Sequence, residues 1–505
     1  MQSTTMYRLT PPPVGLLMAV FLAFSPLPVG AAPQETPLAP VAAPVVSAAP
    51  AQPPADLPPP PPAAVAPPAA PETRVQPDPA PASAAVPPAP PAAAVTASAA
   101  APPADKEQGQ GEEKDKRRDD HDKPWYERLK MRGYTQFRYN RFLETNDKLV
   151  NDQGDKSIGG TGGLFIRRAR LILQGDITEH VSLYFQPDFA STAVDQIHVA
   201  ILRDLYADVF VDKEKQLRFR IGQSKVPFGF ENLQSSQNRA PFDRSDALNS
   251  AVKDERDLGL FVYWETPAVR KLFKELVDSG LKGSGDYGIV GAGVYNGQTA
   301  NKLELNNTPH VVGRVTYPIQ IGSQTIEIGG GGYYGKYNAK KDERVLVEEE
   351  DGKDKAFTDA RVYGQLVWYP KPIGLQVEYN YGKGPEFSAL PQCTEAEQMM
   401  DPDGCAERPI GEIKESSLHG GYAMLLAKFG NFVPYVRGVL YNGGRKFETN
   451  APRYKTRELE LGLECQVIKA LEVTAAYTFA ERTYPKLPYK QENGRFLRLQ
   501  VQVNY

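Results

Sequence analysis

The sequence has no apolar run long enough for a membrane-spanning helix, and it is poor in cysteine and histidine. No stretch reaches the roughly 18 consecutive apolar residues that such a helix needs. The 505 residues include three cysteines and five scattered histidines, with no CxxC pair. A metal site is therefore not expected. No GxSxG or HExxH motif occurs either, so nothing indicates an enzyme or a bound cofactor.

The N-terminal quarter has the composition of exported and unfolded sequence. An apolar stretch, Val14–Phe24, follows Arg8 and precedes small residues, which is typical of a signal peptide cleaved after Ala31. An N-terminal anchor helix is the alternative. Residues 32–124 are a linker, Pro/Ala-rich at first and then mixed in charge, that cannot bury a core and favours extended polyproline II. The folded domain is predicted to span residues 125–505.

The folded part consists of strands with strict period-2 alternation. At the C-terminus Leu497, Leu499, Val501, Val503 and Tyr505 share one face, and polar residues occupy the other. A soluble sheet with one face in a core has the same pattern. About sixteen such segments are predicted, at 134–142, 167–176, 181–188, 205–210, 216–223, 258–264, 287–295, 310–317, 325–336, 361–369, 375–382, 418–429, 432–442, 457–467, 471–482 and 497–505.

The connections distinguish a membrane barrel from a soluble sandwich. Those after even-numbered strands are mostly short, whereas those after odd-numbered strands are long and polar. The exception is 265–285, which contains an amphipathic helix. Transmembrane barrels sort their loops in this way, with short periplasmic turns and long outer loops. We therefore predict an all-β, antiparallel transmembrane barrel of about 16 strands, despite a mean hydropathy of −0.43.

Three segments resemble a known family. They are "RFRIGQSKVPFGFENLQSSQNRAPFDRS" (218–245), "RRARLILQGD" (167–176) and "RDLGLFVYW" (256–264), and they are similar to the phosphate-selective porin O and P family of bacterial outer membranes. The resemblance covers roughly residues 125–505 but not the linker. It implies a homotrimer of sixteen-stranded barrels that passes small anions, phosphate or polyphosphate among them. The terminal aromatic residue resembles the signal read by the outer-membrane barrel assembly machinery.

Strand parity indicates which charges face the lumen. We predict inward arginines and, in the loop after the fifth strand (224–255), basic residues that line the pore and bind anions: Arg138, Arg168, Arg170, Arg218, Arg220, Lys225, Arg239, Arg244, Arg361, Arg437 and Arg498. Inward carboxylates are also predicted, at Asp188, Glu378, Glu458, Glu460, Glu464 and Glu472.

The overall charge leaves the selectivity open. Of the 58 basic and 61 acidic residues, 8 and 13 precede residue 128, so the remainder has 50 basic and 48 acidic side chains. Because the inward arginines gather on a few strands, we predict a modest anion preference in an outer-membrane porin. The alternative is a general, weakly selective porin, or a barrel that tethers the cell wall or adheres to a partner.

Two further expectations concern cysteines and partners. Cys393 and Cys405 lie in one polar outer segment and are expected to pair in an oxidising compartment, whereas Cys465 stands alone in a strand. The expected partners are small inorganic anions, outer-membrane lipid, the assembly machinery, two further copies of the chain, and a periplasmic or cell-wall partner of the linker.

Overall fold

The computed structural model describes residues 124–145, 163–193, 196–251, 256–339, 344–350, 353–444, 453–484 and 490–505. The predicted signal peptide and almost the entire predicted linker lie outside these ranges. The first described element is a short 3-10 helix, η1 (Trp125–Arg128), which leads into the first strand.

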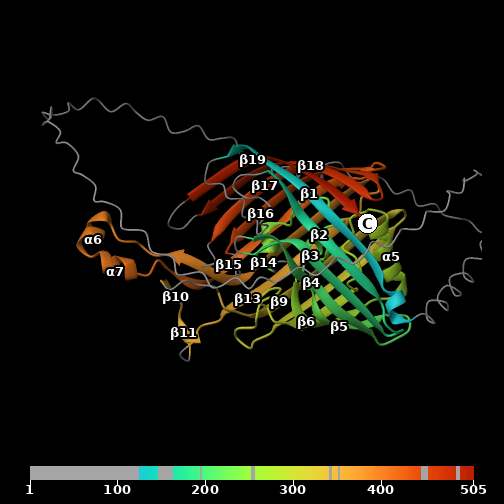
Figure 1. Ribbon diagram of the computed structural model, residues 1–505, viewed down its shortest axis with the longest axis horizontal. Coiled ribbons are helices and arrows are strands. Elements are labelled where there is room, and N and C mark those ends of the chain that lie inside the picture. Colours follow the sequence, from blue (N-terminus) through green and yellow to red (C-terminus); the bar gives the residue numbers. More distant parts are fainter. Residues whose placement is uncertain are drawn as a thin grey trace, which may run out of the picture. The chain divides into compact units, whose positions relative to one another are not determined.

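Sixteen long antiparallel strands form a closed barrel in the described part of the chain (Figure 1). They are β1 (Lys130–Thr145), β2 (Gly163–Asp176), β3 (Val181–Ala193), β4 (Gln196–Phe210), β5 (Leu217–Lys225), β6 (Arg256–Trp264), β7 (Val290–Tyr295), β8 (His310–Ile321), β9 (Gln324–Tyr337), β13 (Phe357–Trp368), β14 (Ile373–Ala389), β15 (Gly411–Ala427), β16 (Phe432–Gly443), β17 (Tyr454–Ile468), β18 (Leu471–Tyr484) and β19 (Lys490–Asn504). Each matches one predicted segment, so the fold prediction is confirmed. The short strands β10 (Val345–Leu346), β11 (Glu349–Glu350) and β12 (Lys353–Asp354) lie in the β9–β13 connection.

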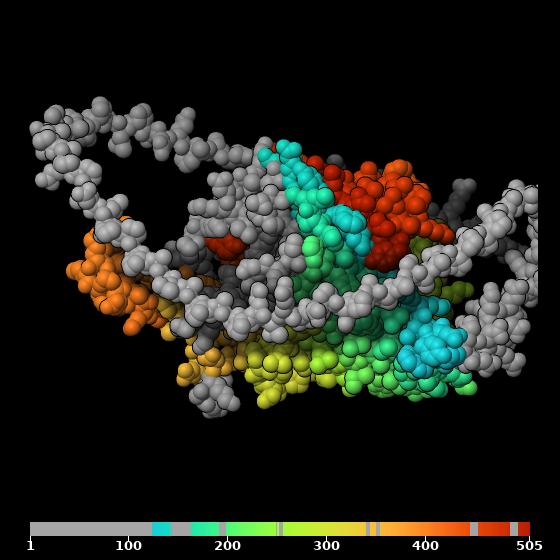
Figure 2. All heavy atoms as spheres, viewed as in Figure 1, coloured from blue at the N-terminus to red at the C-terminus, as the bar shows by residue number. Residues whose placement is uncertain are grey.

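The first and last strands close the ring. β19 pairs with β1 in an antiparallel register that runs from Tyr134↔Asn504 to Thr145↔Gly494. The Tyr505 N–H donates to the Gly133 carbonyl at 3.0 Å, and the Gly133 N–H donates to the Tyr505 carbonyl at 2.6 Å. Figure 2 shows β1 in cyan beside the C-terminal strands in red. Closure leaves the sheet without a free edge, as a membrane-spanning sheet requires.

The alternation of the strands separates an apolar outer face from a polar inner one. On β1, Gln136 and Arg138 are buried, whereas Phe137 between them is 41% exposed. Exposed apolar side chains recur on neighbouring strands, for example Ile221, Leu260 and Val315. An apolar band around a closed barrel is the surface that lipid covers. No helix in the described ranges is long and apolar enough to cross a membrane.

The connections differ at the two ends of the barrel, as predicted. Residues 322–323, 369–372, 428–431 and 469–470 make short turns at the end where the C-terminus lies, and α5 (Pro267–Asp278) is also at this end (Figure 1). The opposite end has the long connections, including α6 (Glu395–Met400) and α7 (Pro402–Glu407). One long connection was predicted wrongly, because β3 and β4 continue to Ala193 and Gln196 and pair there in a hairpin.

Helix α5 turns its apolar side into the barrel. Thr266 caps its N-terminus by accepting the Val269 N–H, and Pro267 occupies the first turn. Phe273 and Leu276 are buried against inner residues of the β13 end and against Phe230 of the β5–β6 connection. The predicted amphipathic helix is therefore present, and it packs at the short-turn mouth of the barrel.

Candidate functional site

The connection between β5 and β6 folds into the barrel. This lumen loop, residues 226–251, contains α3 (Phe230–Leu233) and α4 (Asp246–Asn249), and most of its residues are buried. Its side chains contact strands from β1 and β19 to β13 and β14, which only a position inside the closed ring allows. Gly229 has a φ of 79°, and a Cβ there would lie 2.5 Å from Glu378 Oε1. Glycine is therefore required where the loop meets β14.

Asp243 is the main anionic anchor of the lumen loop. Arg138 Nη1 donates to both of its carboxylate oxygens, at 3.0 and 3.1 Å, and Arg498 Nη1 donates to Oδ2 at 2.7 Å. A third guanidinium, that of Arg167, lies 3.8 Å away. Burial acts to raise the pKa of Asp243, but Arg138, Arg498 and Arg167 outweigh it and hold the pKa well below its usual range. The carboxylate therefore stays charged.

Glu231 is a second anchor, on α3. Arg437 of β16 forms an ion pair with its carboxylate, and the Ser245 N–H donates to Glu231 Oε2 at 2.8 Å. The Glu231 N–H in turn donates to Glu378 Oε2 of β14 at 2.9 Å. These contacts join two parts of the loop to the β14–β16 wall. Such buried, charge-assisted hydrogen bonds are among the strongest that proteins make.

The remaining side of the lumen loop is bound through its backbone. Arg361 of β13 donates to the Ala247 carbonyl at 3.0 Å, to Ser250 Oγ at 2.7 Å and to the Ser250 carbonyl at 2.7 Å. Lys225 Nζ donates to the carbonyls of Leu233 and Gln234, at 3.1 and 2.6 Å. The loop is thus fixed from several directions inside the barrel.

A group of guanidiniums remains where the lumen loop faces β2. Arg239 donates only to the carbonyls of Pro241 and Phe242, and its Nη1 has no hydrogen-bond partner in the described part of the chain. Burial lowers the pKa of Arg244, and the neighbouring charges of Arg239 and Arg168 lower it further. Arg168, Arg239 and Arg244 are therefore neighbouring like charges, and each disfavours the charged form of the others.

The other predicted arginines lie in pairs along the wall. Arg170 donates to Asp188 Oδ2 at 2.8 Å, and Arg220 Nε donates to Asp208 Oδ1 at 2.7 Å. Arg218 forms a bidentate pair with Asp286. Ten of the eleven predicted basic site residues are buried, and Arg244 is partly buried. The structure therefore places all eleven side chains on the inner side of the barrel. Most of them donate hydrogen bonds to carboxylates or carbonyls of the protein.

Sequence parity missed the position of Arg167. The register between β1 and β2 shifts between Gln136 and Phe137, which pair with Arg168 and Ile166, so Arg167 is the extra residue of a β-bulge. The bulge turns Arg167 toward Asp243 and leaves Leu164 77% exposed on the outer face. Bulges re-aim side chains in this way. The adjacent arginines of "RRAR" gave no signal of it.

Two carboxyl groups share the short-turn mouth. Asp286 binds Arg218, and Glu265 accepts a hydrogen bond from Arg270 Nε at 2.8 Å. Burial, followed by the hydrogen bond with Asp286 and its charge, raises the pKa of Glu265 to about 8. The same neighbourhood lowers the pKa of Asp286, because Arg218 overcomes the effect of burial. The pair therefore holds one proton at neutral pH.

A disulfide joins Cys393 and Cys405 in the long β14–β15 connection, where the Cα atoms are 5.9 Å apart. The bridge links the start of the connection before α6 to α7. Thr394 and Glu397 form a capping box that begins α6. Cys465 is free, on β17.

Comparison with known proteins identifies the family. The sequence profile of "Phosphate-selective porin O and P" matches residues 145–425. No match to a curated protein reaches significance. Solved structures with a similar arrangement include the outer-membrane channel DcaP of Acinetobacter baumannii (11% identity, TM-score 0.46, covering 75% of this chain and 97% of that one).

Two further solved structures of similar arrangement come from other bacteria. They are OmpF of Salmonella typhi in a complex with daunomycin (10% identity, TM-score 0.45, covering 75% of this chain and 97% of that one) and OprB of Pseudomonas putida (8% identity, TM-score 0.41, covering 78% and 97%). The profile match covers more than half of the 505 residues and includes the lumen loop. The chain belongs to the phosphate-selective porin O and P family and is a channel of the bacterial outer membrane.

Proposed function

We propose that the protein is a passive diffusion channel that prefers small anions, with phosphate-type oxyanions, including polyphosphate, as its best permeants. The observation that carries the proposal is the cluster of three neighbouring guanidiniums, Arg168, Arg239 and Arg244, beside the lumen loop, in which Arg239 Nη1 has no hydrogen-bond partner in the described part of the chain. Guanidiniums stay charged and bind oxyanions through paired N–H groups.

The placement of the carboxylates supports the same proposal. Asp243 and Glu231 are the acidic groups of the loop nearest to this site, and each is bound by arginines of the barrel wall. Their charge is therefore already matched, whereas Arg239 has no carboxylate within ion-pair distance in the described part of the chain. In a narrow passage with low-dielectric walls, such a local excess acts on passing ions more strongly than the net charge does.

One observation favours the second candidate, a general and weakly selective porin. Glu460, Glu464 and Glu472 face inward on β17 and β18, opposite in sign to the guanidinium group. The charges of two of these carboxylates are neutralised by ion pairs, because Arg498 pairs with Glu460 and Lys282 pairs with Glu464. If the remaining carboxylate, that of Glu472, acts on passing ions as strongly as the guanidiniums do, the channel has only a weak preference for anions.

The wider proposal concerns location and partners. Residues 1–31 act as the export signal, and the linker 32–124 stays in the periplasm, where it binds a partner or the cell wall. The barrel inserts through its assembly machinery and forms a homotrimer in outer-membrane lipid.

The test is block of chloride current by phosphate in planar bilayers. The double variant Arg239→Gln with Arg244→Gln should weaken that block and shift the reversal potential toward cation preference, because two positive charges are removed from the lumen loop. Lys383→Gln with Lys455→Gln is the matched control, since both lysines are exposed, on β14 and β17, and their loss makes the same change in net charge without touching the loop. Unchanged block in the double variant contradicts the proposal.

A further inference from the structure

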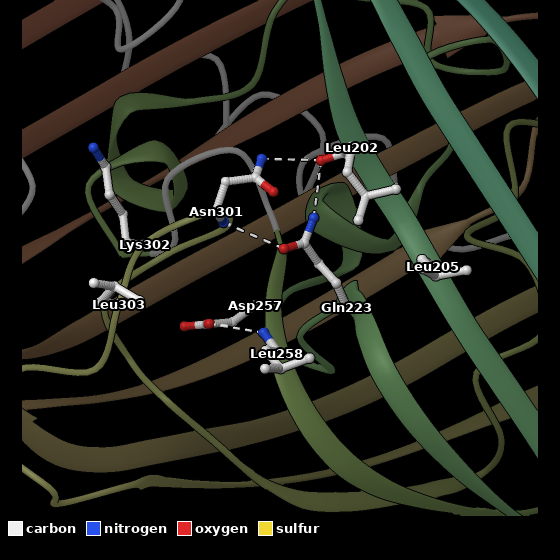
Figure 3. Close-up of a pocket in the computed structure, with 8 residues that line it drawn as sticks. All are labelled: Leu202, Leu205, Gln223, Asp257, Leu258, Asn301, Lys302 and Leu303. Carbon is white, nitrogen blue, oxygen red and sulfur yellow. Dashed lines mark hydrogen bonds between the residues drawn. The ribbon is translucent and has the colours of Figure 1, made fainter.

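A cavity lies on the outer surface of the barrel, away from the lumen loop. It has a volume of about 330 Å³, and it is lined by β4, β5, β6 and the connection that follows β7 (Figure 3). This is within the range of small-molecule pockets, which begin at roughly 300 Å³. The cavity is at the ends of β5 and β6 that the long loop joins, and long loops face the cell exterior. It therefore opens at the level of the outer leaflet.

The polar groups of the cavity are used within the protein. Gln223 Nε2 donates to the carbonyls of Leu202 and Arg203, at 2.9 and 3.1 Å. Asn301 donates its backbone N–H to Gln223 Oε1 at 3.2 Å and its side-chain N–H to the Leu202 carbonyl at 3.0 Å. Figure 3 shows this network between the leucines. It fixes the loop against β4 and β5 and leaves an apolar lining.

Asp257 organises the same loop from β6. Its Oδ2 accepts the N–H groups of Gly297 and Thr299, at 2.8 and 3.1 Å, and its Oδ1 accepts the N–H of Leu258 at 2.8 Å. The loop is thereby held at a fixed distance from the strands. The cavity is consequently a preformed feature of the fold.

The walls of the cavity continue the lipid-facing band. They consist of Leu202, Leu205, Leu258 and Leu303, of which Leu258 is 53% exposed and Leu303 is 84% exposed. The exposed apolar residues Leu260 and Ile221 follow directly on β6 and β5. The established lipid interface of the barrel thus extends without interruption into the cavity.

Lys302 is the one basic residue among the eight that line the cavity. Lys302 is part of the lining and is exposed to solvent, and in Figure 3 its ammonium group points away from the polar network. We propose that the cavity binds one acyl chain of an outer-leaflet lipid whose phosphate group pairs with Lys302. Juxtamembrane lysines attract anionic lipid headgroups in this way. The proposal is independent of the selectivity of the pore.

The test uses the full-length protein, purified in detergent, delipidated and mixed with a bis-phosphorylated lipid A. Native mass spectrometry counts the lipid retained per barrel. Leu258→Trp, which fills the cavity, should abolish retention of the tightly held lipid. Lys302→Gln should reduce its affinity on the order of fivefold, which corresponds to the loss of one basic contact with an anionic lipid. Dephosphorylated lipid A should bind the unmodified protein as weakly as phosphorylated lipid A binds Lys302→Gln.

Two control variants distinguish lipid binding in the cavity from lipid binding on the rest of the apolar outer surface. Leu463→Trp adds the same bulk at an exposed position on β17, and Lys383→Gln removes a lysine elsewhere on the barrel. Both should retain lipid as the unmodified protein does. If Leu258→Trp does not fold, Leu303→Ser removes one wall at an exposed loop position and should weaken retention. Lipid retention that is equal in all variants overturns the proposal. A loss of oligomer mass in Leu258→Trp with unchanged lipid also overturns it, because the occupant is then a second copy of the chain.

Discussion

Replacing Asp243 by Asn removes the charge that three guanidiniums share. The Asn side chain keeps the volume but leaves Arg138 and Arg498 without their common counter-ion. Removing one partner of a buried ion pair costs about 3–5 kcal/mol. That cost weakens the attachment of the lumen loop, because the barrel ladder does not involve Asp243. The barrel should therefore remain folded while the loop is held less firmly.

The same change alters the field in the passage. Because Asp243 is buried, a passing ion stays about 10 Å away, where a unit charge acts on it with about 1.7 kcal/mol at an effective dielectric constant of 20. A tenfold change in a ratio requires about 1.4 kcal/mol. Asp243→Asn should therefore increase the permeability ratio of chloride to potassium by about tenfold, as read from the reversal potential in a KCl gradient, and it should add current fluctuations from the loosened loop.

Asp176→Asn is the matched control for this prediction. Asp176 pairs with Lys215 at 2.9 Å at the end of β2, and its side chain is 48% exposed, outside the lumen. The control makes the same change in net charge and should leave selectivity and current noise unchanged. If Asp243→Asn behaves like Asp176→Asn, the loop carboxylate does not act on the ion path and the reasoning is refuted.

Three other predictions use different parts of the structure. Deleting Phe496–Tyr505 should abolish the heat-modifiable folded form, because β19 closes the ring against both β1 and β18; folded protein in the outer membrane would contradict this. Glu265→Gln should remove a pH dependence of thermal unfolding. The Glu265 carboxyl keeps its proton up to about pH 8 in the folded protein, whereas it releases the proton near pH 4.5 in the unfolded chain. The stability that Glu265 contributes is therefore full below pH 4.5 and falls as the pH rises to 8. A slope that persists in the variant would assign it to another group. Cys393→Ser should speed proteolysis of the β14–β15 connection by freeing Cys405, with little effect on the barrel; mass mapping that finds both thiols free in the native protein would oppose this.

The barrel could be predicted because its signals are local. Alternation along each strand and the sorting of short and long connections are properties of neighbouring residues, and the closed sixteen-stranded ring follows from them. The strand ends were less well predicted, since β3, β4, β14 and β15 extend beyond their apolar alternation into polar hairpins. In these strand ends the backbone hydrogen bonds between neighbouring strands continue although the side chains no longer alternate between apolar and polar.

The partners of the inner charges could not be predicted from the sequence. Parity placed Arg138 and Arg498 on the inner face, but their common partner Asp243 is 255 residues from Arg498 along the chain. Whether an inward arginine faces water or a carboxylate depends on how the lumen loop folds. The inward position of Arg167 was not predicted, because a β-bulge in β2 shifts the alternation of inward and outward side chains by one residue. The sequence of β2 does not show where this bulge lies.

The central claim is that the passage prefers anions because guanidinium charge at the lumen loop exceeds carboxylate charge. The reversal potential of the unmodified protein in a KCl gradient across a planar bilayer tests it most directly. The account predicts the sign that reports chloride permeating faster than potassium, together with reduced chloride current when phosphate is added. A reversal potential of the opposite sign, with no effect of phosphate, would contradict it.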